Sequence, residues 1–192
     1  MSARGRAGGR AAARGRAPSF PCVRCGAPLR RVATHGRREI RCPRCRFLIF
    51  DYPRACAGTV VLKGDQVLML RRAHAPKRGW LDIPGGFMEA NETIERAARR
   101  ELREETGLAL GRVSQLGIYW DRYYLRGFGY FPTLNFYFVG WWRKGTPRAA
   151  DDAASAEWIP LAKLGTPGQR LAWKHMRDVF RDVRRMRKSS PR

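Results

Sequence analysis

The distribution of apolar and polar positions predicts strands on both sides of one amphipathic helix. Residues 57–63 and 66–72 are mostly apolar and flank Gly64-Asp65, a dipeptide that favours a β-hairpin turn. After the helix, β-branched and aromatic residues are concentrated at 113–124, 133–142 and 154–160. Such runs are typical of strands. Strands before and after a central helix predict a mixed α/β domain.

The predicted helix, residues 93–106, has an unusual distribution of charge. Its apolar stripe at helical spacing consists of Ile94, Ala97, Ala98 and Leu102. Glu101 and Glu105 fall within this stripe and Glu104 flanks it, so three carboxylates share the side that should face the core. Burying even one uncompensated carboxylate costs several kcal/mol. We therefore expect a cation to meet these side chains.

Two kinds of cation fit this pattern. Mg²⁺ prefers oxygen ligands and is often shared between a few carboxylates and the phosphates of a substrate. The alternative is an ordinary charged helix in which Arg99, Arg100 and Arg103 neutralise the glutamates. Of these three arginines, only Arg100 lies beside the carboxylate face at helical spacing. The pattern therefore favours a metal site.

Residues with special backbone properties mark the ends of this helix. Pro84-Gly85-Gly86 ends a short apolar run and allows a tight turn or a close approach to a ligand. Thr93 suits the N-cap position. Gly107 suits the left-handed position after the last turn. A short helix between a glycine loop and a glycine stop is expected.

This segment resembles the Nudix box of the Nudix hydrolase superfamily. The matching positions, at fixed spacing, are Gly86, Glu92, Arg100-Glu101-Leu102, Glu104-Glu105 and Gly107-Leu108. Asn91 departs from the pattern, since relatives usually carry Gly there, but Asn tolerates a positive φ. The resemblance implies an α/β/α Nudix sandwich and metal-dependent cleavage of a pyrophosphate bond in a nucleotide derivative.

The resemblance also implies roles for residues of the box. Glu101, Glu104 and Glu105 would bind catalytic Mg²⁺ or Mn²⁺, with the carbonyl of Gly85 as a further ligand. Glu101 would bind metal or act as the base, and Arg100 would orient it. For Glu89 and Glu92 a metal-binding role and a structural role are equally open.

Candidates outside the box complete the predicted site. Relatives often use a later acid as the base, and Asp152 is the first candidate, with Asp151 and Glu157 as alternatives. Basic residues just before the box loop are expected either to bind phosphate or to be solvated surface: Arg71, Arg72, Lys77 and Arg78. Aromatic residues within 119–130 are candidates for stacking on a base, although strand aromatics commonly belong to a core.

Four cysteines near the start predict a separate metal site. Cys22 and Cys25 form one CxxC pair, and Cys42 and Cys45 form a second pair after a gap of 16 residues. Two such pairs are the ligand set of a structural zinc ribbon, in which four sulfurs leave no open position for chemistry. Cys56 stands outside this pattern and is expected to be a buried free thiol.

The net charge of +23 is concentrated at the ends of the chain. Residues 1–46 contain 13 Arg and one acid, a net +12, and residues 170–192 carry a net +7. Residues 1–19 repeat Arg, Gly and Ala and are expected to be disordered. These basic ends allow weak contact with nucleic acid. The alternative is an Arg-rich extension without a function, because the chain uses 33 Arg against 6 Lys.

A second amphipathic helix is predicted over residues 167–186. Its apolar face consists of Leu171, Met176, Val179, Phe180 and Val183. We expect this helix to pack on the sheet; binding to a membrane or an acidic partner is the alternative. The expected division of the chain is a basic tail at 1–19, a zinc ribbon at 20–50, a Nudix domain at 51–164, the C-terminal helix at 165–187 and a tail at 188–192.

Length and composition agree with a soluble enzyme. The chain has 192 residues, of which 44% are hydrophobic, enough for one core and a small module. No apolar run approaches the roughly 18 residues of a membrane span, and no signal-peptide core is present. We expect a cytoplasmic protein with no membrane partner; a homodimer is an open alternative to a monomer.

The substrate is less well defined by the sequence. A zinc ribbon followed by a Nudix domain resembles the NADH pyrophosphatase group, which also removes NAD caps from RNA. The Ser-Gln-Pro-Trp-Pro-Phe-Pro-x-Ser signature of that group is absent from residues 119–133. Other zinc-ribbon relatives act on ADP-ribose or FAD, so ADP-ribose is the first expectation and NADH, FAD or NAD-capped RNA the alternative. A nucleic-acid-binding or ligand-sensing regulator is the non-enzymatic alternative.

Overall fold

The computed structural model describes residues 20–34, 37–49, 52–126 and 129–189. The chain divides into two compact units, Met1–Tyr52 and Pro53–Arg192. The predicted basic tail at 1–19, the residues at the predicted boundary 50–51 and the last residues of the C-terminal tail lie outside the described ranges.

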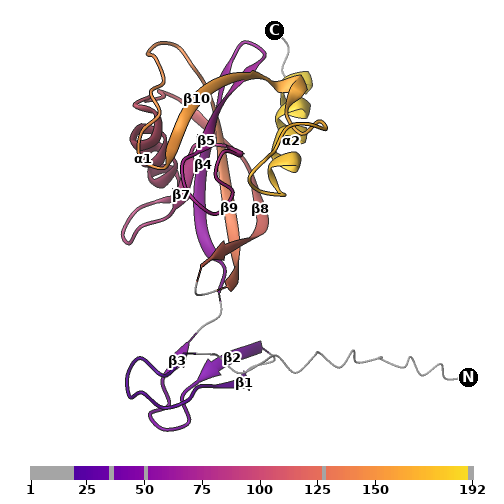
Figure 1. Cartoon of the computed structure of the whole chain (residues 1–192). Coiled ribbons are helices and arrows are strands. Elements are labelled where there is room, and N and C mark those ends of the chain that lie inside the picture. The colour runs from indigo at the N-terminus through magenta and orange to yellow at the C-terminus, as the bar shows by residue number, and fades with distance from the viewer. Residues whose placement is uncertain (1–19, 35–36, 50–51, 127–128, 190–192) are drawn as a thin grey trace, which may run out of the picture. The chain divides into compact units, whose positions relative to one another are not determined.

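The smaller unit is a three-stranded sheet with the four cysteines beside it. Its strands, in the spatial order β1-β2-β3, are antiparallel: β1 (Arg30–Thr34), β2 (Arg37–Arg41) and β3 (Leu48–Ile49) (Figure 1). Leu29 and Ile40 pack with Cys22 and Cys42 in its small core. So small a core needs a further source of stability such as a bound metal.

The larger unit contains a seven-stranded mixed sheet. Its main path runs in the order β10-β5-β4-β9-β8, with β6 paired to β5 and β7 paired to β4. The strands are β4 (Arg54–Lys63), β5 (Gln66–Arg72), β6 (Leu81–Asp82), β7 (Gly85–Phe87), β8 (Val113–Leu125), β9 (Gly129–Trp141) and β10 (Ala153–Pro160). β4 and β9 are parallel to each other, whereas all other pairs are antiparallel. The predicted hairpin and the later strands are confirmed.

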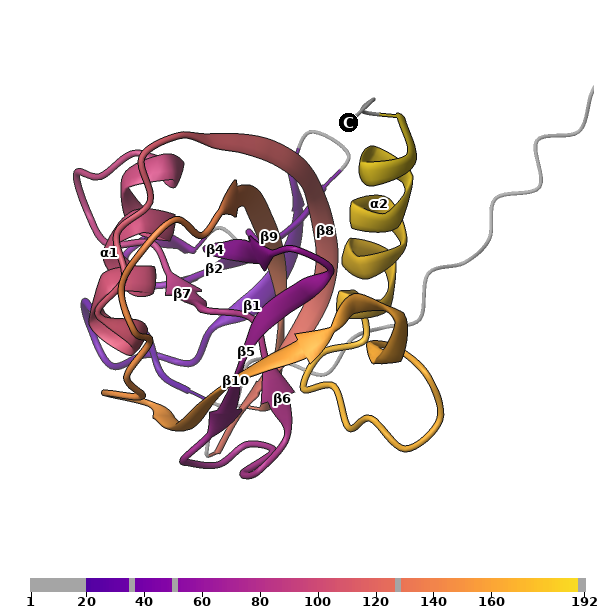
Figure 2. The ribbon, with the colours of Figure 1, turned by 90° about the horizontal axis from the view of Figure 1, so that it is seen from above.

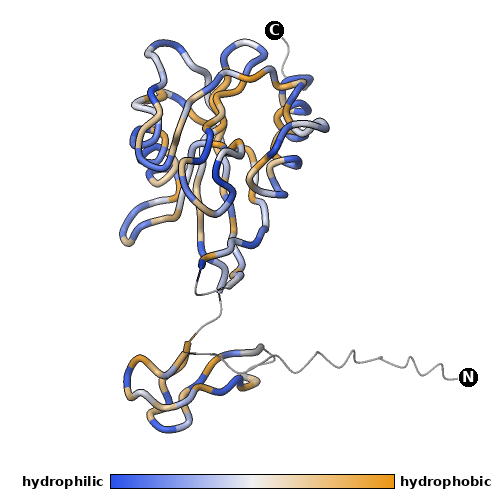
Figure 3. The backbone as a smooth tube through the Cα atoms, in the orientation of Figure 1, coloured by the Kyte–Doolittle hydropathy of each residue, from blue (hydrophilic) through white to orange (hydrophobic). Residues whose placement is uncertain are grey.

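Two helices lie on opposite sides of this sheet. Figure 2 shows α1 (Ile94–Thr106) and α2 (Met176–Ser189) with the strands between them, and a short 3₁₀ turn, η1 (Leu161–Lys163), follows β10. The predicted α/β/α arrangement is confirmed. The hydropathy of the chain follows the same plan, because hydrophobic stretches gather along the central strands and hydrophilic ones at the outer loops (Figure 3). Among the described residues, no helix is long and apolar enough to cross a membrane.

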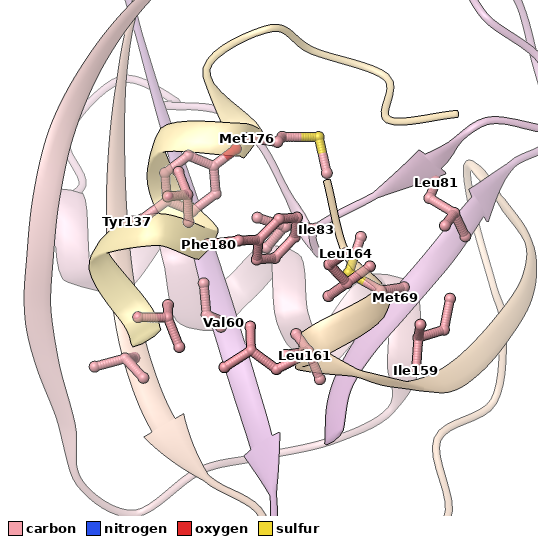
Figure 4. Close-up of a cluster of buried hydrophobic side chains, with 14 of the residues drawn as sticks. Val60, Met69, Leu81, Ile83, Tyr137, Ile159, Leu161, Leu164, Met176 and Phe180 are labelled. Carbon is pink, nitrogen blue, oxygen red and sulfur yellow. The ribbon is translucent and has the colours of Figure 1, made fainter. Parts of the chain in front are cut away.

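The main core lies between α2 and the sheet. Met176 and Phe180 are fully buried in one cluster with Val60, Met69 and Leu161, and Phe180 lies beside Ile83 (Figure 4). A second group of apolar side chains lies under α1 and consists of Val61, Leu68, Leu102, Leu108 and Leu110. Each helix therefore buries the apolar stripe that its sequence predicts.

The prediction for the start of the C-terminal helix was wrong. The helix begins at Met176, not at residue 167, and continues to Ser189. The preceding segment is held by β6 instead: Leu81 N donates to Arg170 O, and Ala172 N donates to Leu81 O, both at 2.8 Å. Backbone groups bonded to β6 are unavailable for a helix ladder, so residues 170–172 do not join the helix.

The capping residues of α1 were predicted correctly. Thr93 Oγ1 accepts a hydrogen bond from Arg96 N at 3.3 Å, and Gly107 has the left-handed φ of 69° that ends the helix. Asn91, which replaces the usual glycine of the box, also has a positive φ, of 67°. The local backbone of the box is therefore kept despite this substitution.

A register shift in β8 decides which of its side chains face inward. The pairing with β9 shifts between Gln115 and Gly117. Beyond this point Tyr119, Asp121 and Tyr123 are wholly or partly buried, whereas the residues between them are exposed. The inward residues of β8 thus contribute to the site described next.

Candidate active site

A cavity of about 390 Å³ lies in the larger unit. It is lined by strands β4, β8 and β9, by β7 and α1, and by the segment that precedes α2. Of the predicted site residues, the cavity lining includes Arg72, Gly85, Arg100, Glu101, Glu105, Asp151 and Asp152. Most of the sequence-predicted site is therefore brought together in one place.

The diglycine of β7 allows its backbone to lie against the box helix. A Cβ on Gly86 would be 2.5 Å from Glu101 Oε1, and a Cβ on Gly85 would be 2.5 Å from Ala57 O. Neither position has room for a side chain. Gly85 N donates a hydrogen bond of 2.8 Å to Glu105 Oε2. Gly85 thus brings a backbone donor to Glu105, and Gly86 leaves space for the side chain of Glu101.

Glu105 is the least compensated of the three glutamates. Its side chain is buried, with 8% of the residue exposed, and it accepts a hydrogen bond from the Gly85 amide. Within the described part of the chain, no arginine or lysine forms an ion pair with it. Burial raises the pKa of Glu105 to about 9, and the nearby acids Asp82, Glu101 and Asp152 act in the same direction. A positive charge placed here would be strongly stabilised.

Arg100 is shared among the other glutamates of the box. Its guanidinium donates to Glu101 Oε1 at 2.8 Å, to Glu104 Oε2 at 2.9 Å and to Glu92 Oε1 at 2.8 Å. It also donates to Phe87 O at 3.1 Å. Burial raises the pKa of Glu101, although the hydrogen bond from Arg100 opposes this shift. Arg100 therefore orients Glu101. The alternative, in which arginine neutralises the glutamates, applies to Glu101 and Glu104 but not to Glu105.

The arrangement of oxygen donors fits a hard divalent cation. Glu101 and Glu105 both line the cavity, and Glu105 lacks a cationic partner within the described residues. The side chain of Glu104 is half exposed and does not line the cavity, so it would reach the same ion only after leaving Arg100. Carboxylates of this kind, beside a space for substrate, are the usual ligands of Mg²⁺.

The two candidate bases of the β9–β10 loop lie at the rim of the cavity. Asp151 and Asp152 are both exposed, and both line it. The third candidate, Glu157, lies outside the lining and accepts two hydrogen bonds from Arg71, at 2.5 and 3.1 Å. This pairing lowers the pKa of Glu157 and leaves Asp151 and Asp152 as the better-placed candidates.

Only one of the predicted phosphate-binding residues lines the cavity. Arg72 does so, and it donates to Asp82 Oδ2 at 3.0 Å. Arg71 forms an ion pair with Glu157. Arg78 is exposed and lies outside the cavity lining. Lys77 also lies outside it and donates to Ala172 O.

Phe87 and Tyr123 line the cavity and, with Phe131 beside them, form an aromatic platform. The ring centroids of Phe87 and Tyr123 are 5.3 Å apart, and those of Tyr123 and Phe131 are 5.6 Å apart. The guanidinium of Arg54 lies over the Phe87 ring at 4.3 Å. Arg54 is exposed and pairs with no carboxylate among the described residues. Tyr123 falls within the aromatic run that the sequence indicated, whereas Arg54 and Phe87 were not predicted.

A polar group on another wall was also missed. His175 Nδ1 lies 2.7 Å from Asp121 Oδ2, and His175 Nε2 lies 3.0 Å from the hydroxyl of Tyr137. Burial alone would raise the pKa of Asp121, but hydrogen bonds from His175 and from Arg122 N lower it to about 2. These residues lie up to 54 positions apart in the sequence, and no local pattern indicates their contact.

The four cysteines of the smaller unit form a compact group. Their ligand atoms lie within 4.8 Å of one another; Cys22 and Cys45 sulfurs are 3.6 Å apart, and those of Cys25 and Cys42 are 3.4 Å apart. Sulfurs around tetrahedral zinc are separated by about 3.8 Å, as the usual Zn–S bond length requires. The cysteine group therefore fits zinc. Cys56 is a free thiol that lines the cavity of the other unit.

Comparisons with known proteins agree with this architecture. The model of the NUDIX domain family matches residues 52–183. The ADP-ribose pyrophosphatase of Methanocaldococcus jannaschii is 32% identical over 142 residues, which are 73% of this chain and 78% of that relative. The NAD-capped RNA hydrolase NudC of Pseudomonas aeruginosa is 29% identical over 163 residues, 83% of this chain; the chain spans about half of NudC, 54% of its length.

A solved structure supports the fold. The NUDIX hydrolase from Nitrosomonas europaea superposes with a TM-score of 0.66 at 23% identity, covering 90% of this chain and 94% of that one. The fold, with its sheet between two helices, is thus shared with a solved NUDIX hydrolase. The chain belongs to the NUDIX domain family and is a Nudix hydrolase.

Proposed function

We propose that this protein is a Mg²⁺-dependent pyrophosphohydrolase that cleaves a nucleoside diphosphate derivative, with ADP-ribose as the first substrate. The observation that carries the proposal is the environment of Glu105: a carboxylate buried beside Glu101, next to a cavity, with one backbone donor and no cation among the described residues. Such a group calls for a positive charge that arrives with the substrate.

Each residue of the box has a distinct part in the proposed reaction. Glu101, Glu104 and Glu105 would hold the divalent cation, together with the carbonyl of Gly85. When bound, the cation polarises the diphosphate and lowers the pKa of an attacking water. Arg100 keeps Glu101 in position through its 2.8 Å hydrogen bond. Asp152, at the rim, accepts the proton of the water, and the products are two phosphate monoesters.

The cavity suits a substrate with a planar base next to its diphosphate. The aromatic platform begins at Phe87, directly after the diglycine that borders the carboxylates. Aromatic rings stack on nucleobases, and the free guanidinium of Arg54 offers a positive charge beside them. The relative from M. jannaschii is named an ADP-ribose pyrophosphatase, which favours ADP-ribose. The NudC relatives are named NAD-capped RNA hydrolases, which keeps NAD-capped RNA as an alternative. NADH and FAD are the further alternatives that the sequence resemblance suggests.

A substrate screen tests the proposal. ADP-ribose, NADH, FAD, dinucleoside polyphosphates and NAD-capped RNA are incubated with the full chain and Mg²⁺ or Mn²⁺, and the phosphate monoesters are quantified. Glu104→Gln and Glu105→Gln should each lower turnover by at least a hundredfold. Glu95→Gln is the matched control, because Glu95 lies on the outer face of the same helix and pairs with Arg99. Cleavage of none of these compounds, or full activity of both variants, would contradict the proposal.

Zinc at the four cysteines has a structural role in this proposal. Cys22, Cys25, Cys42 and Cys45 occupy all four positions of a tetrahedral site, which leaves none for water or substrate. The ion would therefore hold the smaller unit together.

Two further interactions belong to the proposal: contact of the basic ends with nucleic acid and association into a homodimer. Weak contact of the basic ends with nucleic acid predicts binding that falls steeply with salt. Tight salt-sensitive binding without Mg²⁺-dependent turnover would instead favour a regulator. Light scattering across a concentration series distinguishes a homodimer from a monomer, and fractionation of cells tests the proposed cytoplasmic location.

A further inference from the structure

We propose that Trp173 and His175, which lie outside the box and just before α2, are positioning residues of the metal site. They hold the backbone of Gly85 in the position in which its N–H donates a hydrogen bond to Glu105. This inference rests on the proposed function for its consequence in catalysis. The contacts themselves follow two paths from the segment before α2 to Gly85.

The first path runs through Asp82. Trp173 Nε1 donates to Asp82 Oδ2 at 2.9 Å, and Arg72 donates to the same oxygen at 3.0 Å. The other oxygen of Asp82 accepts from Ile83 N at 2.9 Å. A carboxylate with three donors has one orientation available to it. Asp82 is buried and stands three residues before Gly85, so it fixes the chain that enters the diglycine loop.

The second path runs through Tyr137 and Gly58. With Asp121 ionised, His175 Nδ1–H donates to it at 2.7 Å, which leaves Nε2 to accept from the Tyr137 hydroxyl at 3.0 Å. The Tyr137 ring lies so close to Gly58 that a Cβ there would be 2.7 Å from the ring. Gly58 in turn packs against Gly85, where a Cβ would be 2.6 Å from the Gly58 Cα.

Both paths end at the hydrogen bond that orients Glu105. Gly85 N donates to Glu105 Oε2 at 2.8 Å, and this carboxylate has no ion-pair partner among the described residues. The direction of the Gly85 N–H therefore sets the direction of the carboxylate. Groups that orient a metal ligand typically change metal affinity by about 10- to 100-fold when they are lost.

The test removes single hydrogen bonds and keeps the rings. Trp173→Phe removes the donor to Asp82, and Tyr137→Phe removes the hydroxyl that contacts His175. The matched controls are Trp120→Phe and Tyr130→Phe, because these side chains are 60% and 69% exposed. His175→Gln, which keeps a hydrogen-bonding group toward Tyr137, should lie closer to wild type than His175→Ala.

The deciding measurement is amide hydrogen exchange of Gly85 by NMR in magnesium-free protein. Trp173→Phe and Tyr137→Phe should each speed exchange at Gly85 about tenfold while the core amides of α2, such as Val179 and Phe180, stay protected. The affinity for Mn²⁺, measured by electron paramagnetic resonance, should fall about tenfold. Neither control should change either quantity.

A purely structural role gives a different result. If the two residues only dock α2, its core amides exchange faster and the Gly85 amide does not, which overturns the inference. An unchanged Gly85 amide in either variant overturns it as well. The exchange experiment needs neither substrate nor metal, so its failure is separate from that of the proposed function. Even if the protein cleaves none of the screened compounds, amide exchange at Gly85 shows whether Trp173 and His175 hold its backbone.

Discussion

A carboxyl group as buried as that of Glu105 exchanges its hydration for one backbone N–H. The free-energy cost of this exchange depends on whether the group carries a charge. Burial places the pKa of Glu105 near 9, so in the metal-free protein the acid form predominates at neutral pH. Divalent cation and proton therefore compete for the same oxygens.

The stability of the metal-free protein should reflect this pKa. Below pH 4.5, the ordinary pKa of a glutamate, Glu105 is protonated in both folded and unfolded chains and its burial is tolerated. Between that pH and about 9 the unfolded chain loses the proton and the folded chain keeps it, so the free energy of unfolding falls as pH rises. Glu105→Gln should reduce this decline. Urea unfolding across pH in magnesium-free buffer measures it, with Glu95→Gln as the control; identical slopes for wild type and Glu105→Gln would contradict the prediction.

At the scale of elements, α2 and the segment before it depend on contacts that are remote in sequence. Phe180 is fully buried in the main core, where it meets strands of the sheet (Figure 4). The helix is therefore held by packing, as is usual for a helix of only 14 residues.

Phe180→Ala should lower the free energy of unfolding of the larger unit by about 3–5 kcal/mol. The lost packing and the cavity left behind both contribute to this loss. Arg181→Ala, on the exposed side of the same helix, should stay within about 0.5 kcal/mol of wild type. Denaturant unfolding followed by tryptophan fluorescence measures both. A loss below about 1 kcal/mol for Phe180→Ala would mean that α2 is not an integral part of this core.

The sequence determines those elements whose signals are local. The α1 helix could be predicted with both caps, because Thr93, Gly107 and the apolar stripe lie within one short stretch. The start of α2 could not, since the backbone of residues 170–172 bonds to Leu81, some 90 positions earlier. The same holds for Trp173 and His175, whose partners Asp82 and Asp121 are remote in sequence. A local motif therefore predicts the candidate metal ligands. The residues that hold those ligands in position are set by tertiary packing and could not be predicted from the sequence.

At the scale of the whole molecule, the two units have separate sources of stability. The smaller one has a core of a few residues around its cysteines, and the larger one has an extended core between two helices. Metal binding and folding are coupled in units of the first kind.

Cys22→Ser should therefore abolish zinc binding and unfold the smaller unit while the thermal transition of the larger unit persists. Cys56→Ser is the matched control, because this thiol lies outside the cysteine group. Atomic absorption measures the zinc content, and calorimetry follows the two transitions. Unchanged zinc in Cys22→Ser would disprove the ligand assignment.

The register shift between Gln115 and Gly117 has a consequence for how β8 responds to a change in its length. Side chains alternate between the two faces of a strand, so a change of one residue in length upstream would exchange the faces of everything downstream. A bulge absorbs or releases such a change locally. A one-residue deletion at the bulge would remove the extra residue and keep the pairings of Gln115 with Phe138 and of Gly117 with Tyr137, so Tyr119, Asp121 and Tyr123 would still face inward. The inward side chains of β8, of which Asp121 and Tyr123 line the cavity, are therefore tolerant of a change in length at this one place.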